Sequence, residues 1–205
     1  MRKNRMQVTK IEEGKGKCYR VYGDEEYLFS LYGTELKQYH ITEWADIDSD
    51  VIRDIIDNLI YKRARERALY LLERRPLSIR MMKEKLQRNE YPDDVIDRVV
   101  LFLRQYQYLD DAEYVRMYVN SYGGRKSKRQ LCCDLLTKGL AKDVIDDYFA
   151  QNDYSEEQSF SIQFERYIRG KNLQDYSVRN KVFRYFYGKG FSASLIESYL
   201  KEREI

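Results

Sequence analysis

The chain has 205 residues, of which 43% are hydrophobic and 35% are charged, and its formal net charge is +3 at pH 7. The hydrophobic fraction suffices for a core, whereas only 2 prolines and 10 glycines argue against a loop-rich all-β fold. Its 3 cysteines are too few for a disulfide framework, and no apolar run reaches the roughly 18 residues of a membrane span. With no apolar run behind the basic N-terminus, we expect a cytoplasmic protein without a signal peptide.

Residues 1–45 are predicted to form a small β extension. Alternating or aromatic segments at 6–11, 18–22 and 27–32 are separated by glycine-containing turns, a pattern typical of an antiparallel sheet. Two or three strands are only marginally stable alone, so we expect this sheet to lean on a helix.

A connecting helix is predicted over residues 46–61. Apolar residues from Val51 to Ile60 recur at helical spacing. Asp46, Asp48 or Ser49 can cap the start of this helix, because a side-chain oxygen there accepts a hydrogen bond from a free backbone N–H.

The rest of the chain repeats one pattern three times. Leu86, Leu135 and Phe186 begin equivalent segments about 50 residues apart, and a period of this size indicates a modular array. We assign repeats to 62–109, 110–154 and 155–205. Each repeat is predicted to contain three helices, lying at 62–74, 78–89 and 92–107, at 111–122, 127–138 and 142–151, and at 156–169, 177–188 and 192–203. Such an array is expected to be elongated and to offer a partner an extended surface.

Helix start and stop signals support these boundaries. Capping boxes are predicted at Asp110/Glu113, Ser127/Gln130 and Ser155/Gln158, and Pro92 is placed in a first helical turn before Asp93 and Asp94. Gly139 and Gly190 fall just past their middle helices, where a left-handed residue ends a helix at little cost.

Three motifs are informative together: the stretch from Ala68 to Pro76, the stretch from Tyr108 to Tyr114, and the Lys-Gly-hydrophobic element at 138–140 and 189–191. In these motifs the chain resembles the RecX family, regulators of the RecA recombinase. The resemblance covers roughly residues 62–205 and implies a mainly α fold of three tandem three-helix repeats. In the first repeat, Asn89-Glu90 replaces Lys-Gly. There we expect a left-handed, slightly strained Glu90, and a Glu90→Gly substitution that is neutral or stabilising.

The resemblance also implies a function. RecX proteins bind the RecA–single-stranded DNA filament and inhibit its ATPase, strand exchange or filament growth, and so modulate recombinational DNA repair and the SOS response. The implied partners are RecA and the single-stranded DNA within the filament, and we expect a monomer. A stand-alone DNA-binding helical module is the alternative, because a three-helix unit can place a helix in a major groove.

Nothing in the residues points to an enzyme. His40 is the only histidine, no Gly-rich phosphate loop is present, and the two adjacent cysteines, Cys132 and Cys133, do not form a CxxC motif. We therefore predict no catalytic, cofactor or metal site, and expect one of these two cysteines to belong to the core.

The predicted contact residues are basic. Arg125, Lys126, Lys128 and Arg129 surround one helix start, where they oppose the helix dipole, so we interpret them as serving a partner rather than the fold. Ser127 and nearby backbone N–H groups are a candidate phosphate site, although a solvated basic turn is the plain alternative. Basic residues recur on the matching helices of the other repeats, and from these the predicted contacts are Arg80, Lys83, Lys85, Arg179, Lys181 and Lys189.

Two further surface patterns were weighed. The densest positive stretch holds Arg63, Arg65, Arg67, Arg74 and Arg75, and it fits either a charged helix face or a contact with DNA or an acidic partner. Tyr114, Tyr118 and Tyr122 recur every four residues, which favours a packed helix face over a base-stacking platform.

Overall fold

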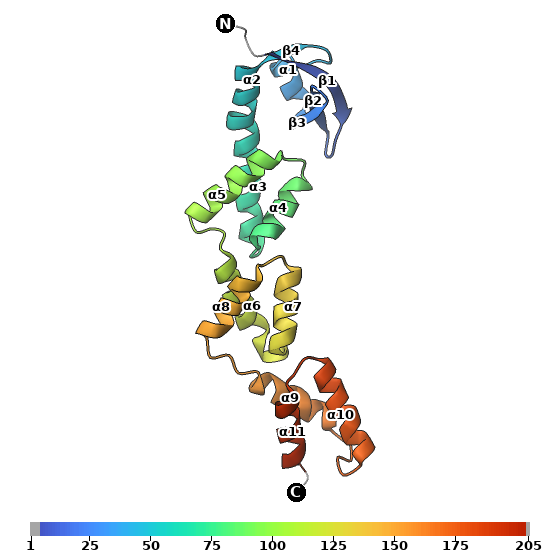
Figure 1. Ribbon diagram of the computed structural model, residues 1–205. Helices are drawn as coiled ribbons and strands as arrows, with labels where there is room; N and C mark the ends of the chain where they lie inside the picture. Colours follow the sequence, from blue (N-terminus) through green and yellow to red (C-terminus); the bar gives the residue numbers. More distant parts are fainter. Residues whose placement is uncertain (1–4, 204–205) are drawn as a thin grey trace. The chain divides into compact units, whose positions relative to one another are not determined.

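The computed structural model describes residues 5–203 and is mostly helical, with a small antiparallel sheet at its N-terminal end (Figure 1). The predicted mainly α fold class is therefore confirmed. The chain divides into two compact units, Met1–Asp110 and Asp111–Ile205.

The first unit begins with a four-stranded antiparallel sheet. Its strands are β1 (Arg5–Glu13), β2 (Cys18–Gly23), β3 (Glu26–Tyr32) and β4 (Asp46–Asp48), in the order β3-β2-β1-β4. Three of these strands were predicted. The short strand β4 and the helix α1 (Gly33–Gln38) were not, since three residues are too few to reveal an alternating pattern.

A long helix leads from the sheet into the first repeat. It consists of α2 (Ser49–Asp54), a π-helical segment (Ile55–Ile60) and α3 (Tyr61–Arg74), and the residues at both junctions keep right-handed helical angles. Asp48 caps its start, since the carboxylate accepts a 3.2 Å hydrogen bond from the Asp50 N–H. The predicted connecting helix and the first helix of repeat one are thus continuous.

The remaining helices of the first unit are α4 (Ile79–Gln87) and α5 (Asp93–Gln105). Ser78 caps α4, and Pro92 lies at the cap position of α5 rather than inside its first turn, which still carries Asp93 and Asp94 as predicted. The buried residues of the sheet and of these helices form one hydrophobic core, including Val21, Phe29, Met82, Leu86 and Val99. The expectation that the sheet leans on a helix is confirmed.

The second unit contains six α-helices among the described residues. They are α6 (Asp111–Tyr122), α7 (Lys128–Thr137), α8 (Lys142–Gln151), α9 (Glu157–Ile168), α10 (Tyr176–Gly188) and α11 (Ala193–Glu202), and a short 3-10 turn (Gly123–Arg125) follows α6. The last three helices enclose an aromatic core in which Phe160, Phe164, Phe186 and Phe191 are fully or almost fully buried.

The middle helices α4, α7 and α10 end in the same way. Gly139 and Gly190 have φ values of 82° and 87°, and Glu90 has a φ of 61°, so all three are left-handed as predicted. In each case the N–H of this residue and the next N–H donate to carbonyls of the last helical turn. These bonds satisfy carbonyls that the end of a helix would otherwise leave free.

Helix starts follow the predictions less closely. The capping box of Ser127 and Gln130 is confirmed, with both hydrogen bonds present. The box predicted at Ser155 is wrong, because α9 begins one residue later with Glu156 as its cap, and the Ser155 hydroxyl accepts instead from the Glu157 N–H.

Glu90 does more than end a helix. Its carboxylate forms an ion pair with Arg20 of β2 and accepts a 3.3 Å hydrogen bond from the Lys15 N–H, and the Tyr27 hydroxyl donates to the Glu90 carbonyl. The hydrogen bond from Arg20 holds the pKa of Glu90 below its ordinary value. The side chain therefore fastens the N-terminal sheet to the first repeat, and the structure gives no support to the expectation that Glu90→Gly is neutral or stabilising.

Candidate interaction surface

The start of α7 is fixed by a hydrogen-bond network that involves Ser127. This serine is fully buried, and its Oγ accepts from the Gln130 N–H and donates to the Lys189 carbonyl at 2.7 Å. The Lys128 N–H is taken by the Glu156 carboxylate at 2.8 Å. Since neither group is available to a ligand, the predicted phosphate site at Ser127 is wrong, and Ser127 instead joins two helical repeats.

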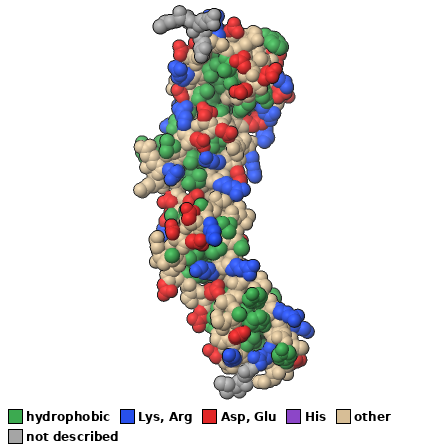
Figure 2. All heavy atoms as spheres, in the orientation of Figure 1, with side chains coloured by type: hydrophobic (Ala, Val, Ile, Leu, Met, Phe, Trp, Pro, Cys, Tyr) green, Lys and Arg blue, Asp and Glu red, His purple; other side chains and the backbone are tan. Residues whose placement is uncertain are grey.

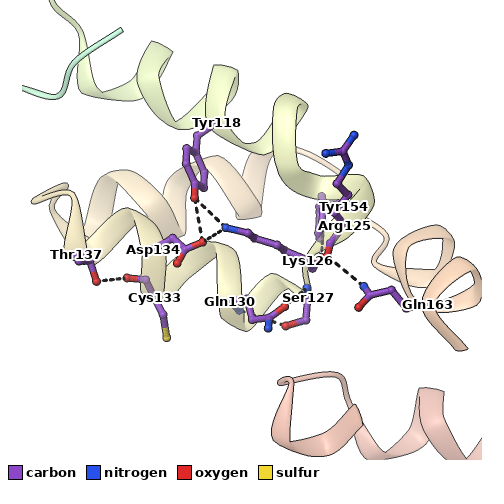
Figure 3. Close-up of polar contacts among 10 residues, drawn as sticks. All are labelled: Tyr118, Arg125, Lys126, Ser127, Gln130, Cys133, Asp134, Thr137, Tyr154 and Gln163. Atoms are coloured by element: carbon purple, nitrogen blue, oxygen red, sulfur yellow. Dashed lines mark hydrogen bonds and ion pairs between the residues drawn. The ribbon is translucent and has the colours of Figure 1, made fainter. Parts of the chain in front are cut away.

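Lys126 is also part of the fold. Its ammonium forms an ion pair with Asp134 of α7 and donates to the Tyr118 hydroxyl of α6 at 3.1 Å, while Tyr118 donates to Asp134 at 2.9 Å (Figure 3). The same ammonium lies 4.9 Å from the ring centroid of Tyr122. Only 31% of the Lys126 side chain is exposed. Lys126 therefore serves the fold, contrary to the prediction that none of the four basic residues of this turn does so.

The pKa values of this triad follow from the contacts. The hydrogen bond to Asp134 raises the pKa of Lys126. Burial alone would raise the pKa of Asp134, but hydrogen bonds from Lys126 and Tyr118 outweigh burial and lower it. Burial raises the pKa of Tyr118. At neutral pH the site thus holds a charged lysine, a charged aspartate and a neutral phenol.

The other three basic residues of the turn are exposed. Arg125, Lys128 and Arg129 make no ion pair with any residue between 5 and 203. Lys128 lies over the ring of Phe149, with its ammonium 4.9 Å from the centroid. We define these three residues as the α7 basic cluster, and their charges are open to solvent.

A groove beside this cluster is lined by residues of two repeats. It has a volume of about 340 Å³ and is lined by Lys126, Arg129 and Asp134 on one side and by Gly188, Lys189 and Gly190 on the other. The Lys189 ammonium donates to Gln163 at 2.9 Å and lies 4.7 Å from the ring centroid of Tyr185. The structure thus brings Lys189 close to Lys126 and Arg129, although some sixty residues of sequence separate Lys189 from the other two.

The remaining predicted contact residues are placed differently. On α10, Lys181 is exposed and Arg179 is half-buried, and Lys181 lies about 12 Å along the helix from Lys189. On α4 in the first unit, Arg80 pairs with Glu84 at 2.9 Å and Lys83 pairs with Asp97 at 2.7 Å, while Lys85 is half-buried. Two of the three α4 cations are thus already neutralised by carboxylates.

Charges of both signs are mixed over the surface. On the face that Figure 2 shows, Lys and Arg side chains lie interspersed with Asp and Glu side chains. Local clusters such as the α7 basic cluster therefore carry more information about a partner than the net charge does.

The tyrosine stripe of α6 forms a packed helix face. Tyr114 is buried, Tyr118 is half-buried and Tyr122 is 41% exposed, and successive rings lie 6.3 Å and 4.5 Å apart. Cys132 is half-buried and Cys133 is exposed, so the expectation that one of these cysteines belongs to the core is wrong.

Sequence reasoning did not find Asp134 or Tyr118 as partners of Lys126. The carboxylate follows Lys126 by eight residues and sits on the next helix, a spacing that no local pattern marks. The contact between Ser127 and Lys189 was equally hidden, because it joins separate repeats.

Residues 5–203 give no support for a metal site or for a membrane-spanning helix. No group of three His, Cys, Asp or Glu residues there is arranged to hold a metal ion. Nor does any helix in that range combine the length and apolar character needed to cross a membrane.

Comparison with known proteins identifies the family. Residues 64–103 match the family model described as RecX, first three-helix domain. The regulatory protein RecX of Clostridium acetobutylicum is 31% identical over 204 residues, covering 95% of each chain. A crystal structure of a regulatory protein RecX aligns with a TM-score of 0.60 and 24% identity over 94% of this chain and 97% of its own. A RecX structure from Lactobacillus salivarius aligns with a TM-score of 0.63 and 18% identity, over 70% of this chain and 96% of its own. The 31% identity with the Clostridium acetobutylicum relative, over almost the whole length of both chains, shows that the chain belongs to the RecX family.

Proposed function

We propose that the protein is a non-enzymatic regulator that binds the RecA–single-stranded DNA filament. Binding inhibits the ATPase, strand exchange or growth of the filament and so modulates recombinational DNA repair. Its full-length relatives carry the name of regulatory proteins, which supports a regulatory role. The resemblance of its repeat motifs to RecX supports RecA as the partner.

One structural observation carries the choice of surface. The α7 basic cluster holds Arg125, Lys128 and Arg129 exposed around a helix start, with no carboxylate paired to them among the described residues. Positive charge at a helix N-terminus opposes the helix dipole and weakens the helix slightly, so the helix itself gains nothing from these three charges, although Lys128 also lies over the ring of Phe149. A filament that contains nucleic acid presents phosphates, which attract such charges. Lys189 at the end of the neighbouring helix α10, and Lys181 about 12 Å along that helix, extend the proposed contact.

A charge-reversal variant tests this proposal. We expect Arg125→Glu/Lys128→Glu/Arg129→Glu to keep its helical fold, because exposed substitutions change stability by about ±0.5 kcal/mol each. The same variant is expected to lose inhibition of the DNA-dependent ATPase of RecA from the same host. Lys126 is left intact, since its change would disturb the fold.

The matched control is Lys142→Glu/Arg166→Glu/Arg169→Glu, which makes the same charge change at exposed positions of the same unit. The control should inhibit like the unaltered protein. Full inhibition by the α7 variant would remove this surface from the proposal. Equal binding of the unaltered protein to bare DNA and to the filament at matched salt would favour the alternative, a stand-alone DNA-binding module.

A further inference from the structure

A second, larger pocket lies in the first unit, between the N-terminal sheet and the first repeat. It has a volume of about 470 Å³. Its walls come from the turn after β1, from α3 and from the segment that follows α4, and its polar lining includes Lys15, Tyr32, Arg63, Arg67, Arg88 and Tyr91. Pockets of about 300–1,000 Å³ are typical of small-molecule sites.

The pocket has an excess of positive charge. Arg63 is neutralised by Glu35, and Glu90, which also lines the pocket, is neutralised by Arg20. Lys15, Arg67 and Arg88 make no ion pair with a described residue, and Glu66 is the remaining carboxylate of the lining. Three exposed cations are thus gathered around one cavity against one anion, an arrangement that favours the binding of an anion.

The dense arginine stretch of the sequence explains which cations face the pocket. Arg63 and Arg67 are four residues apart on α3 and therefore share a face. Arg65 lies instead over the ring of Phe102 at 5.2 Å, and Arg74 lies over the ring of Tyr70 at 4.8 Å. Arg67 lines the cavity as well, although its guanidinium also lies 5.4 Å from the ring centroid of Tyr70.

Two tyrosines add a recognition surface. Tyr91 is half-buried, and burial raises the pKa of its phenol, so the hydroxyl stays protonated and can donate to an anion. The Arg63 guanidinium lies 4.7 Å from the ring centroid of Tyr32. Guanidinium and phenol planes of this kind can also contact a nucleobase.

We propose that this pocket binds the phosphate of a nucleotide, with Lys15, Arg67 and Arg88 as charged donors and the Tyr91 hydroxyl as a neutral donor. A bare phosphate would occupy little of the cavity, whereas a mononucleotide also fills the part beside Tyr32. The nucleotide can be a free mononucleotide or one residue of a single strand, since both present the same phosphate and base. The lining of this pocket shares no residue with the α7 basic cluster, so the proposal stands whether or not the proposed function holds.

Calorimetric titration of the full chain tests the proposal with inorganic phosphate, AMP and a short oligothymidylate as probes. We expect saturable binding of AMP, of the oligonucleotide or of both, competed by phosphate. The variant Arg67→Glu/Arg88→Glu should weaken this binding at least about tenfold, because it removes two charge-assisted hydrogen-bond donors. Tyr91→Phe should also weaken it, while circular dichroism shows unchanged melting.

The matched control is Arg74→Glu/Arg75→Glu, which makes the same charge change in the same stretch of sequence outside the pocket lining. The control should bind all probes like the unaltered protein. Binding of AMP identifies a free nucleotide as a ligand, and binding of the oligonucleotide alone assigns the pocket to a strand. Absence of binding by every probe at millimolar concentration would overturn the proposal, and so would equal losses in the pocket variant and the control.

Discussion

Lys126 gives the sharpest test of how the second unit is held together. Its ammonium joins α6 to α7 through Tyr118 and Asp134, and the side chains of the Lys126–Asp134 pair are 31% and 37% exposed. Such a pair is neither a solvated surface pair, which contributes about 0–1 kcal/mol, nor a fully buried one. We expect it to stabilise the fold by about 1–2 kcal/mol, within the range for hydrogen bonds to charged groups.

Contacts with aromatic rings add to this value. The ammonium lies 5.5 Å and 4.9 Å from the ring centroids of Tyr118 and Tyr122, and each such contact at a partly exposed site contributes about 0.5 kcal/mol. Lys126→Met keeps most of the apolar stem and removes only the charge. We therefore expect it to lower the free energy of unfolding by about 2 kcal/mol.

A double-mutant cycle with Asp134→Asn separates the pair from its surroundings. Urea unfolding of the two single variants and the double variant should give a coupling energy of about 1 kcal/mol or more. Lys128→Met is the control, because Lys128 is exposed and makes no ion pair with a described residue, and loss of its contact with the Phe149 ring should change stability by no more than about 0.5 kcal/mol. Additive effects of Lys126→Met and Asp134→Asn would refute the role of the pair.

Three further outcomes are expected in urea unfolding. Gly190→Ala should destabilise the fold by about 2 kcal/mol, because Gly190 has a φ of 87° and an added Cβ would lie 2.9 Å from the Arg129 Cβ. At Gly188 an added Cβ would meet open space, so Gly188→Ala should be neutral or stabilising by up to about 1 kcal/mol. Equal effects at the two glycines would contradict this reasoning. Glu90→Gly should destabilise by about 1 kcal/mol, because loss of the Arg20 ion pair outweighs relief of the left-handed backbone, and a stabilised variant would show the contrary. The pKa of Glu90 is lowered in the folded state from its ordinary value of 4.5. The extra stability of the unaltered protein over Glu90→Gln should therefore be fully present above pH 4.5 and should disappear as the pH falls through the lowered pKa.

Local patterns predicted most of the helices in this fold. Helical spacing of apolar residues and the glycines at the ends of α7 and α10 placed these helices to within about two residues, which is the ordinary uncertainty of helix ends. Features without a local signature were missed. Strand β4 has three residues and exists only because β1 pairs with it, and Ser155 was displaced as a cap by the neighbouring Glu156.

The candidate site was only partly predictable for the same reason. The sequence marks Arg125, Lys128 and Arg129 as basic residues at a helix start, and the structure leaves them exposed. The sequence cannot show that Lys126 between them turns inward, because its partners Tyr118 and Asp134 come from two different helices. Charge can be read from sequence, whereas the direction of a long side chain depends on which acceptor the tertiary fold places within its reach.

Glu90 shows how a departure from a repeat can record a tertiary contact. The left-handed position that ends α7 and α10 is occupied by glycine, as the backbone favours, yet α4 ends in a glutamate at a φ of 61°. In the first repeat the N-terminal sheet meets this helix end, where Arg20, Lys15 and Tyr27 all bond to Glu90. The contacts of the side chain and carbonyl offset the strain of the backbone. The same contact forms one wall of the pocket proposed here to bind a nucleotide. Loss of Glu90 should therefore loosen the attachment of the sheet, which contributes Lys15 and Tyr32 to the pocket lining.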